Sequence, residues 1–335
     1  MSAAVDFCVC SYEDRPLAMG SVILMGESLC KADQGLRLHL TLPDAPPSVQ
    51  SWAKRWPGVT ISTARPQGVT GWDVKPTLML RELDAGVPAV VWLDTDMIVT
   101  RSISTMLAEF PHEALIVAED IWNRQAEVPL CEFWGLTSVR PLRDINSCVV
   151  RANQTHRTLL ERWSRLINNP RYRHAQTLPF VQRPLPVAGD QWLLEALLES
   201  EDFAHVKVDC LRVGRHIAHC EVSGGYRLHH RLLDLFRGLP ALIHGLGRKP
   251  WTTRTETSRL QRFLIDVATD VSPYVLASRR VARDLNVRLD WLDSRTSLGA
   301  LLRALTANHP GMAGFPLALL RAIHLQTQKA IGFNN

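Results

Sequence analysis

The chain has few lysines, no long apolar run and no cysteine motif, and each absence excludes a class of protein. Lysine occurs at only six of the 335 positions, so arginine supplies most of the positive charge, and the net charge is only +5. That excess can favour an anionic ligand, but it does not make the polycationic surface that binds nucleic acid. We therefore expect no nucleic-acid partner.

No apolar run approaches the roughly 20 residues that cross a bilayer. Asp6 stands near the amino terminus, where a secretory signal would carry Lys or Arg. The seven cysteines are scattered and include no Cys-x-x-Cys pair, which indicates neither a disulfide framework nor a zinc ribbon. These features predict a cytoplasmic protein with reduced thiols.

Apolar and amphipathic segments alternate from about residue 5 to residue 251, in the rhythm of an α/β protein. The run at 89–93 has the composition of a fully buried central strand. Other strands are expected at 5–9, 36–42, 59–61, 114–118, 145–150, 206–208 and 242–243, and helices at 76–83, 155–167 and 190–198. The pattern predicts an α/β fold with a mainly parallel central sheet.

The chain changes character after about Trp251. Residues 252–335 contain no convincing strand pattern, but their leucines recur at helical spacing, as at Leu298, Leu301 and Leu305. We predict two parts, a domain over residues 1–255 and a helical carboxy-terminal appendage over residues 256–335.

Asp94 and Asp96 are the most informative local feature, because they follow directly after the apolar run at 89–93. Open α/β sheets bind ligands where their strands end. Two carboxylates one residue apart can both reach one hard divalent cation, and such a cation can bridge to diphosphate oxygens. The same pattern occurs in solvated turns, but its setting after a buried strand favours a metal site.

The segment VWLDTDMIV at 91–99 resembles the metal-binding segment of GT-A fold glycosyltransferases, especially the retaining enzymes of family 8. Further segments agree with that family in order: 75–83, INSCVV at 145–150, GDQWLL at 189–194 and HGLGRKPW at 244–251. The resemblance implies a GT-A, nucleotide-diphospho-sugar transferase fold. It makes residues 1–255 the nucleotide-sugar-binding and catalytic domain.

The resemblance implies that Asp94, Asp96 and His244 bind the metal, Mn²⁺ or Mg²⁺, with Asp94 also among the donor contacts. Neutral imidazole is an acceptable ligand for Mn²⁺. Lys249 matches the family lysine that contacts the diphosphate, although it follows His244 one residue sooner than is usual. Gly247 permits close approach of the backbone to a phosphate, and a simple turn glycine would look the same.

The resemblance also implies which residues contact the donor sugar. Asp190 corresponds to an acceptor of sugar hydroxyls, and Gln191 to the residue near the anomeric carbon; the alternative for Asp190 is a helix cap. Asn146 resembles the sugar-contacting Asn of the family, with Ser147 beside it, but Cys148 replaces the usual Gly. Asp120 is either a further sugar contact or a solvated acid at a strand end.

Three further residues are implied contacts of the donor nucleotide. Lys75 resembles the basic residue that approaches the donor in related transferases, and the alternative is a surface lysine. Ser11 and Tyr12 stand where these folds hold the nucleobase, and Tyr12 could stack on a uracil ring. An exposed loop aromatic is the alternative for Tyr12.

Together these features predict a metal-dependent transferase. It would move a hexosyl unit from a nucleoside diphosphate sugar, preferably a UDP-sugar, to a glycan, glycolipid or protein acceptor with retention. Front-face attack and a covalent intermediate through Asp190 both stay open.

A sugar-nucleotide pyrophosphorylase is the alternative enzyme, but it would show a Gly-rich basic loop after the first strand, which residues 11–20 lack. A non-catalytic sugar- or partner-binding module on the same fold is the other alternative. The presence of Asp94, Asp96 and His244 argues against it.

The appendage combines apolar and basic residues on helical spacing. Tyr274, Val281 and Leu285 fall near one face of a predicted helix. The same helix also carries Arg279, Arg280 and Arg283. Such helices either pack on the catalytic domain or dock on an anionic membrane, which would place the protein peripherally at the inner membrane surface.

Overall fold

The computed structural model describes residues 7–121, 129–142, 144–220, 226–252 and 258–330. The chain forms two compact units, and each is assembled from several segments of the sequence. Unit 1 comprises Met1–Met19, Asp33–Thr95 and Ser104–Arg212, and unit 2 comprises Gly20–Ala32, Asp96–Ile103 and Val213–Asn335.

Unit 1 is built around a seven-stranded mixed sheet with the strand order β3-β2-β1-β4-β7-β6-β8. Strands β3, β2, β1 and β4 run parallel, β7 runs antiparallel to both of its neighbours, and β8 is parallel to β6. The strands are β1 (Cys8–Tyr12), β2 (Arg37–Thr41), β3 (Val59–Ser62), β4 (Ala89–Leu93), β6 (Leu115–Glu119), β7 (Ile145–Asn153) and β8 (Val208–Leu211). The predicted α/β fold with a mostly parallel sheet is confirmed.

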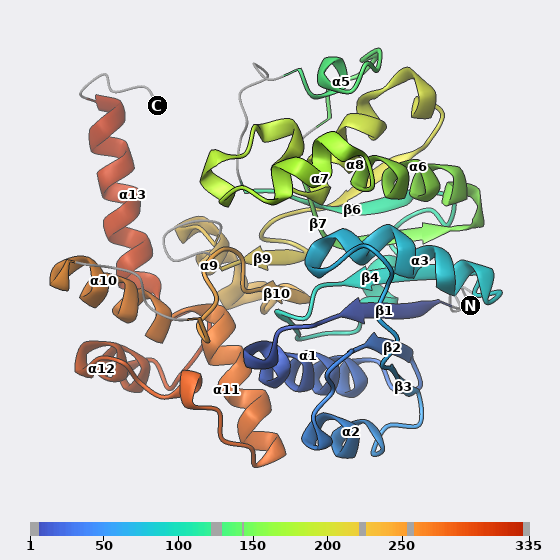
Figure 1. Cartoon of the computed structure of the whole chain (residues 1–335). Helices are drawn as coiled ribbons and strands as arrows, with labels where there is room; N and C mark the ends of the chain where they lie inside the picture. The colour runs from blue at the N-terminus through green and yellow to red at the C-terminus, as the bar shows by residue number, and fades with distance from the viewer. Residues whose placement is uncertain (1–6, 122–128, 143, 221–225, 253–257, 331–335) are drawn as a thin grey trace. The chain divides into compact units, whose positions relative to one another are not determined.

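Helices α3 and α8 pack on this sheet, and α6 packs against both of them (Figure 1). The helices of unit 1 are α2 (Pro47–Ala53), α3 (Lys75–Asp84), α5 (Leu130–Phe133), α6 (Arg157–Ile167), α7 (Pro170–Gln176) and α8 (Asp190–Glu199), and α4 (Ile103–Leu107) begins at the last residue of a unit 2 segment. Pro76 stands in the first turn of α3, where its missing N–H leaves no hydrogen bond unmade.

Strand β4 is buried along its whole length, as predicted for the run at 89–93. Its β-branched residues Val90 and Val91 suit a strand that is covered on both faces. Behind the sheet, the fully buried Trp163 of α6 donates its indole N–H to the carbonyl of Asp190 at 3.0 Å. The core therefore fixes the first residue of α8.

Unit 2 contains a three-stranded sheet in which β10 (Leu242–His244) lies between β5 (Met97–Val99) and β9 (Ile217–His219). Strand β5 is antiparallel to β10, β9 is parallel to it, and α11 packs on β5 and β10. The helices of unit 2 are α1 (Met19–Ala32, of which Met19 counts with unit 1), α9 (Leu228–Arg237), α10 (Arg259–Asp270), α11 (Pro273–Leu285), α12 (Ser297–Leu305) and α13 (Phe315–Ala330).

The regular elements described within residues 258–330 are all helical, as the spacing of their apolar residues predicts. A separate domain over 256–335 stays a prediction. Strand β8 begins at Val208, two residues later than expected, and residues 5 and 6 of the expected first strand lie outside the described residues. Over the part of the chain that the structure describes, no helix combines the length and apolarity needed to span a membrane.

A buried carboxyl group joins two helical segments of unit 1. Asp73, in the turn before α3, accepts a hydrogen bond of 2.6 Å from the hydroxyl of Tyr172 in α7. Burial raises the pKa of Asp73 to about 6, and the bond from Tyr172 only partly opposes it. The unfolded chain ionises near pH 4 instead, so the folded state holds this proton over a wider range of pH.

The Asp73→Asn variant should change how stability depends on pH. In the wild type, stability should fall as pH rises from about 4 to 6, because only the unfolded state ionises there. The neutral amide removes this loss while keeping an oxygen for Tyr172. The variant should therefore be more stable than the wild type at pH 8, by about 1–3 kcal/mol, and nearly equal at pH 4.

Urea unfolding of both proteins at the two pH values checks this, with the exposed Asp202→Asn as control. An Asp73→Asn protein with the pH profile of the wild type would contradict the assignment.

Candidate active site

A buried ammonium group organises the end of the sheet in unit 1. Lys75, the first residue of α3, is 3% exposed, and its Nζ lies 3.4 Å from Asp94 Oδ1 and 3.3 Å from Asp190 Oδ2. The ammonium also donates to Ser147, at 2.8 Å to the hydroxyl and 3.2 Å to the carbonyl. Lys75 is therefore no surface lysine.

The charge of Lys75 is held by its neighbours. Burial alone would lower the pKa of Lys75, but the carboxylates of Asp190 and Asp94 outweigh it and raise the pKa above its usual value. A buried charge is tolerated when it is paired and hydrogen-bonded in this way. Loss of the ammonium would leave the two carboxylates to repel each other.

Asp94 follows the last residue of β4 and lies opposite Cys148 of β7. Its backbone N–H donates to the carbonyl of Cys148 at 2.9 Å, and its carboxylate accepts a bond of 2.6 Å from the indole of Trp92. Its side chain is 26% exposed, more than those of Lys75 and Asp190. One carboxylate of the predicted metal pair is thus held by neighbouring groups and still reaches solvent.

Asp190 is the first residue of α8, whose cap position is taken by Gly189. Its carboxylate accepts a bond of 2.7 Å from the hydroxyl of Ser147 and pairs with Lys75. It therefore does not serve as the side-chain cap that its sequence position also allowed.

The carboxylate of Asp120 binds two of the other predicted sugar contacts. It follows β6, and its Oδ2 accepts bonds from Asn146 Nδ2 at 3.3 Å and from Gln191 Nε2 at 3.1 Å. The side-chain oxygen of Asn146 in turn accepts from the N–H of Cys148 at 3.0 Å. Polar groups at the end of β6 and at the starts of β7 and α8 therefore lie close together.

Ser11 and Tyr12 are buried in the same unit. Ser11 is fully buried and donates its hydroxyl to the carbonyl of Leu93, and Tyr12 is 6% exposed and donates to Asp14 at 3.1 Å. Tyr12 is thus not an exposed loop aromatic. Contact of either residue with a nucleobase stays a prediction.

Thr95 and Glu13 form a contact that the sequence did not indicate. The hydroxyl of Thr95 donates to Glu13 Oε2 at 2.7 Å, and Arg15 pairs with the same carboxylate at 2.7 Å. The residue between Asp94 and Asp96 is thereby tied to the segment after β1. No motif pointed to this bond, because Glu13 and Thr95 are far apart in the chain.

The second cluster lies in unit 2, around the buried carboxylate of Asp96. Strands β5 and β10 pair so that His244 faces Met97, and the N–H of Gly245 donates to the carbonyl of Asp96 at 2.9 Å. Asp96 Oδ1 lies 3.4 Å from His244 Nε2, and Oδ2 accepts a bond from Lys249 Nζ. Each oxygen of the carboxylate thus faces a different basic group.

These basic groups control the ionisation of Asp96. Burial alone would raise the pKa of Asp96, but Lys249 and His244 hold it far below its usual value. Asp96 is therefore an anion at any ordinary pH. One ion about 2.1 Å from each ligand atom can lie between atoms 3.4 Å apart, so the carboxylate and imidazole suit a divalent cation.

Lys249 follows a glycine-containing turn. Gly247 has a φ of +74°, a conformation that residues with a Cβ rarely adopt, and Lys249 Nζ also donates to the carbonyl of Gly245 at 2.8 Å. The turn brings the ammonium back onto Asp96. Contact of Gly247 or Lys249 with a phosphate stays a prediction.

His219 is a residue of this cluster that the sequence did not reveal. It pairs with His244 in the parallel register of β9 and β10, and their Nδ1 atoms are 2.9 Å apart. One Nδ1 must carry a proton that the other accepts. If His244 donates, its Nε2 keeps the lone pair that a metal needs. The run Ile217-Ala218 was the only sequence signal, and it is too short to predict a strand.

No family model matches the sequence, and no curated protein matches it either. The chain is similar to solved structures of three glycosyltransferases. The apo form of the bifunctional WbbM has 12% sequence identity and a TM-score of 0.46, and the match covers 76% of this chain and 48% of that chain. The galactosyltransferase LgtC with donor and acceptor sugar analogues has 15% identity and a TM-score of 0.46, with 77% of this chain and 94% of that chain covered. GlyE of Streptococcus pneumoniae TIGR4 has 15% identity and a TM-score of 0.44, with 87% of this chain and 65% of that chain covered. The chain spans about half of the WbbM chain.

The His219→Ala variant should weaken Mn²⁺ binding if His244 is a ligand oriented by His219. Loss of such a supporting partner lowers metal affinity by roughly 10- to 100-fold. Mn²⁺ titration followed by electron paramagnetic resonance measures this, with the exposed His229→Ala as a matched control. Equal affinity in both variants would show that the His219–His244 contact is structural only.

Proposed function

We propose that this chain is a glycosyltransferase that transfers a hexosyl unit from a nucleoside diphosphate sugar, preferably a UDP-sugar, to an acceptor hydroxyl with retention. The observation that carries the proposal is the cluster of Lys75, Asp94, Asp190 and Ser147 at the end of β4. Carboxylates, a hydroxyl and an ammonium at that edge of an α/β sheet suit a sugar joined to a diphosphate. The resemblance of the segments around these residues to family 8 supports the same assignment.

Asp94, Asp96 and His244 are the proposed ligands of a divalent cation, Mn²⁺ or Mg²⁺. Only Thr95 separates the two aspartates, so both can reach one ion when the backbone turns between them. The pairing of Asp96 with an imidazole adds a nitrogen ligand that Mn²⁺ accepts. When bound, the cation supplies positive charge to the departing diphosphate.

Lys249 and Gly247 are the proposed diphosphate contacts of the chain itself. The ammonium of Lys249 is partly exposed and neutralised by Asp96 alone among the carboxylates that the structure describes. In the proposed reaction it turns to the phosphate oxygens and stabilises the charge that develops there.

The sugar ring is assigned to Asp190, Asn146, Ser147 and Gln191. Asp190 accepts bonds from sugar hydroxyls, while Lys75 and Ser147 orient its carboxylate and partly oppose the rise in pKa that burial causes. Gln191, held by Asp120, presents its amide oxygen to the positive charge that develops at the anomeric carbon. Ser11 and Tyr12 complete the proposed donor site on the nucleobase side.

Front-face attack is one of two routes to retention, and it accounts for the transfer of the acceptor proton. The acceptor hydroxyl attacks from the side of the leaving group, so a leaving phosphate oxygen can take its proton. A covalent intermediate through Asp190 is the other retaining route, but its pairing with Lys75 makes this carboxylate a weaker nucleophile. The acceptor would be a glycan, glycolipid or protein in the cytoplasm or at the inner membrane surface.

Incubation with UDP-sugars and Mn²⁺ tests the proposal against its alternatives. A transferase releases UDP, faster with acceptor present. A pyrophosphorylase would instead form UTP when pyrophosphate is added, and a binding module would do neither. Absence of UDP release across a panel of donor sugars and acceptors would contradict the proposal.

Asp96→Asn should reduce UDP release by at least about 100-fold, because a charged metal ligand becomes neutral and charge stabilisation by a metal is worth several kcal/mol. Excess chelator should abolish the wild-type rate in the same way. The control is Asp290→Asn, an exposed aspartate of unit 2, which should keep the wild-type rate. Normal turnover by a folded Asp96→Asn protein would remove the cation from the mechanism.

Gln191→Ala should lower kcat by about 10- to 100-fold with little change in the KM of the donor, since the proposed contact strengthens in the transition state. Gln182→Ala, at an exposed glutamine of the same unit, is the matched control. Nuclear magnetic resonance of the product from an α-linked donor should show an α-glycoside. A β-glycoside would overturn retention, whatever the variant does.

A further inference from the structure

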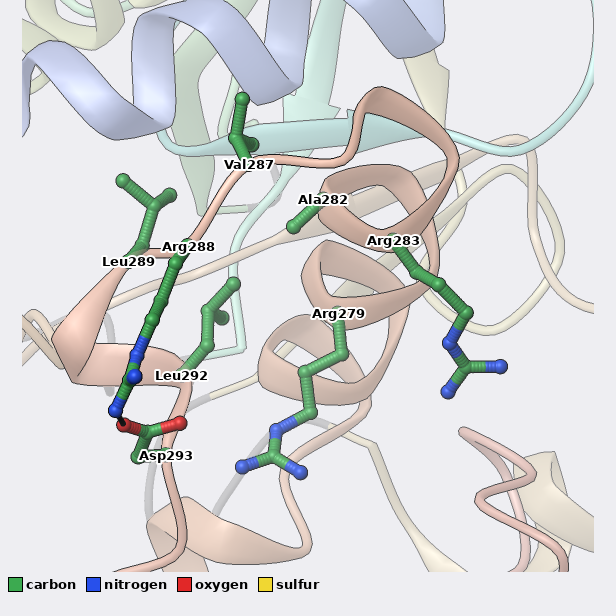
Figure 2. A pocket seen from close by; sticks show the side chains of 8 residues that line it. All are labelled: Arg279, Ala282, Arg283, Val287, Arg288, Leu289, Leu292 and Asp293. Carbon is green, nitrogen blue, oxygen red and sulfur yellow. Dashed lines mark hydrogen bonds and ion pairs between the residues drawn. The ribbon is translucent and has the colours of Figure 1, made fainter.

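A basic pocket lies on unit 2, and none of the residues that line it was assigned above to sugar transfer. It has a volume of about 250 Å³ and is bounded by α11 and the segment that follows this helix. Figure 2 shows Arg279 and Arg283 leaving α11 and Arg288 leaving the following segment, with Asp293 the one acidic side chain drawn. Val287 and Leu292 provide an apolar wall.

Three of the acidic residues near this pocket, Asp270, Asp284 and Asp293, are already engaged. Residues 271–305 contain six arginines and three aspartates. Asp293 pairs with Arg288 at 3.2 Å, and Asp284 pairs with Lys31 at 3.4 Å. The buried Asp270 accepts bonds from the backbone N–H groups of Arg295 and Thr296 at the start of α12.

Two arginines at or next to the pocket lack the partners that buried guanidinium groups normally have. Arg303 is 5% exposed; its Nη2 donates to Ser294, but its Nε and Nη1 are buried without a hydrogen-bond partner. The buried Nε of Arg279 has no partner either. Among the residues that the structure describes, no carboxylate lies within 4 Å of either guanidinium. Unsatisfied buried donors of this kind are rare in proteins.

The two guanidinium groups also act on each other. Burial lowers the pKa of Arg279, and the positive charge of Arg303 lowers it further, while the carboxylates of Asp270 and Asp293 only partly oppose this. Like charges in a partly buried place raise the local potential, and an anion at the pocket would relieve it. The site therefore has excess positive charge as well as N–H donors without acceptors.

We propose that the pocket formed by Arg279, Arg283 and Arg288 binds a phosphate group. Guanidinium is planar and offers paired donors that match phosphate oxygens, which makes arginine the preferred residue for such sites. The apolar wall formed by Val287 and Leu292 suits a ligand whose phosphate is attached to an apolar portion. A soluble phosphate compound and a lipid headgroup share this chemistry.

Two probes distinguish these sources. Inorganic pyrophosphate is titrated into the full chain by calorimetry in 150 mM salt with chelator present, so that the proposed cation site does not contribute. Vesicles of phosphatidylcholine with one fifth phosphatidic acid are tested by co-sedimentation against vesicles of pure phosphatidylcholine. Binding of pyrophosphate alone identifies a soluble ligand, and binding of the acidic vesicles alone identifies a headgroup. Binding of both assigns the site to the phosphate group itself.

Variants connect the binding to the pocket. The double variant Arg279→Gln, Arg283→Gln should weaken binding by about tenfold or more, as expected for the loss of charge-assisted hydrogen bonds. Arg280→Gln removes the same charge from an exposed neighbour on α11 that does not line the pocket, and it should change affinity by less than about twofold. If the double variant does not fold, Arg283→Gln alone, at an exposed position, serves in its place.

The proposal is overturned if neither probe binds the wild type, or if Arg280→Gln weakens binding as much as the pocket variants do. The second result would show general attraction to a basic surface. Because none of these arginines belongs to the proposed transfer site, either failure would leave the proposed function unaffected.

Discussion

The candidate site of unit 1 depends on one constraint, the need to neutralise the buried ammonium of Lys75. Asp94, Asp190 and Ser147 meet this need from three different elements, and so the position of α3 determines where both carboxylates can lie. In the cluster of unit 2 the buried charge is negative instead. The carboxylate of Asp96 lies against an imidazole and an ammonium. Burial makes each charge expensive to leave unpaired, and this gives the polar side chains defined positions.

Much of the fold follows from apolar patterning. The run at β4 is long, β-branched and bounded by aspartates, and α3 and α8 begin at Lys75 and Asp190, within a residue of where the sequence predicts them. The short strands β5 and β9 have three residues each, too few to show a period. The antiparallel direction of β7 was also beyond prediction, because buried parallel and antiparallel strands have the same apolar composition.

The sequence predicted those site residues whose neighbours along the chain indicate their role. It did not predict residues whose role depends on a partner that is distant in the chain. Asp94 and Asp96 are marked by the strand that precedes them. Lys75 and Lys249 are marked by the segments that resemble family 8, and both contact buried carboxylates. The bond from His219 to His244 and the bond from Thr95 to Glu13 left no trace in spacing, since each joins residues that only folding brings together. The same holds for Asp120, whose bonds to Asn146 and Gln191 connect three elements.

The segmented composition of the two units has a consequence for synthesis on the ribosome. Every strand of the seven-stranded sheet has been made once residue 211 is added, so unit 1 can complete its sheet while the chain is still growing. Strand β5 is made early but has no partner until β10 emerges, and Asp96 has no counter-charge before His244 and Lys249 follow. From residue 211 until residue 244 is added, about a tenth of the chain, Asp94 therefore belongs to a sheet that can already be complete, while Asp96, two residues further on, lies in a strand without its partner.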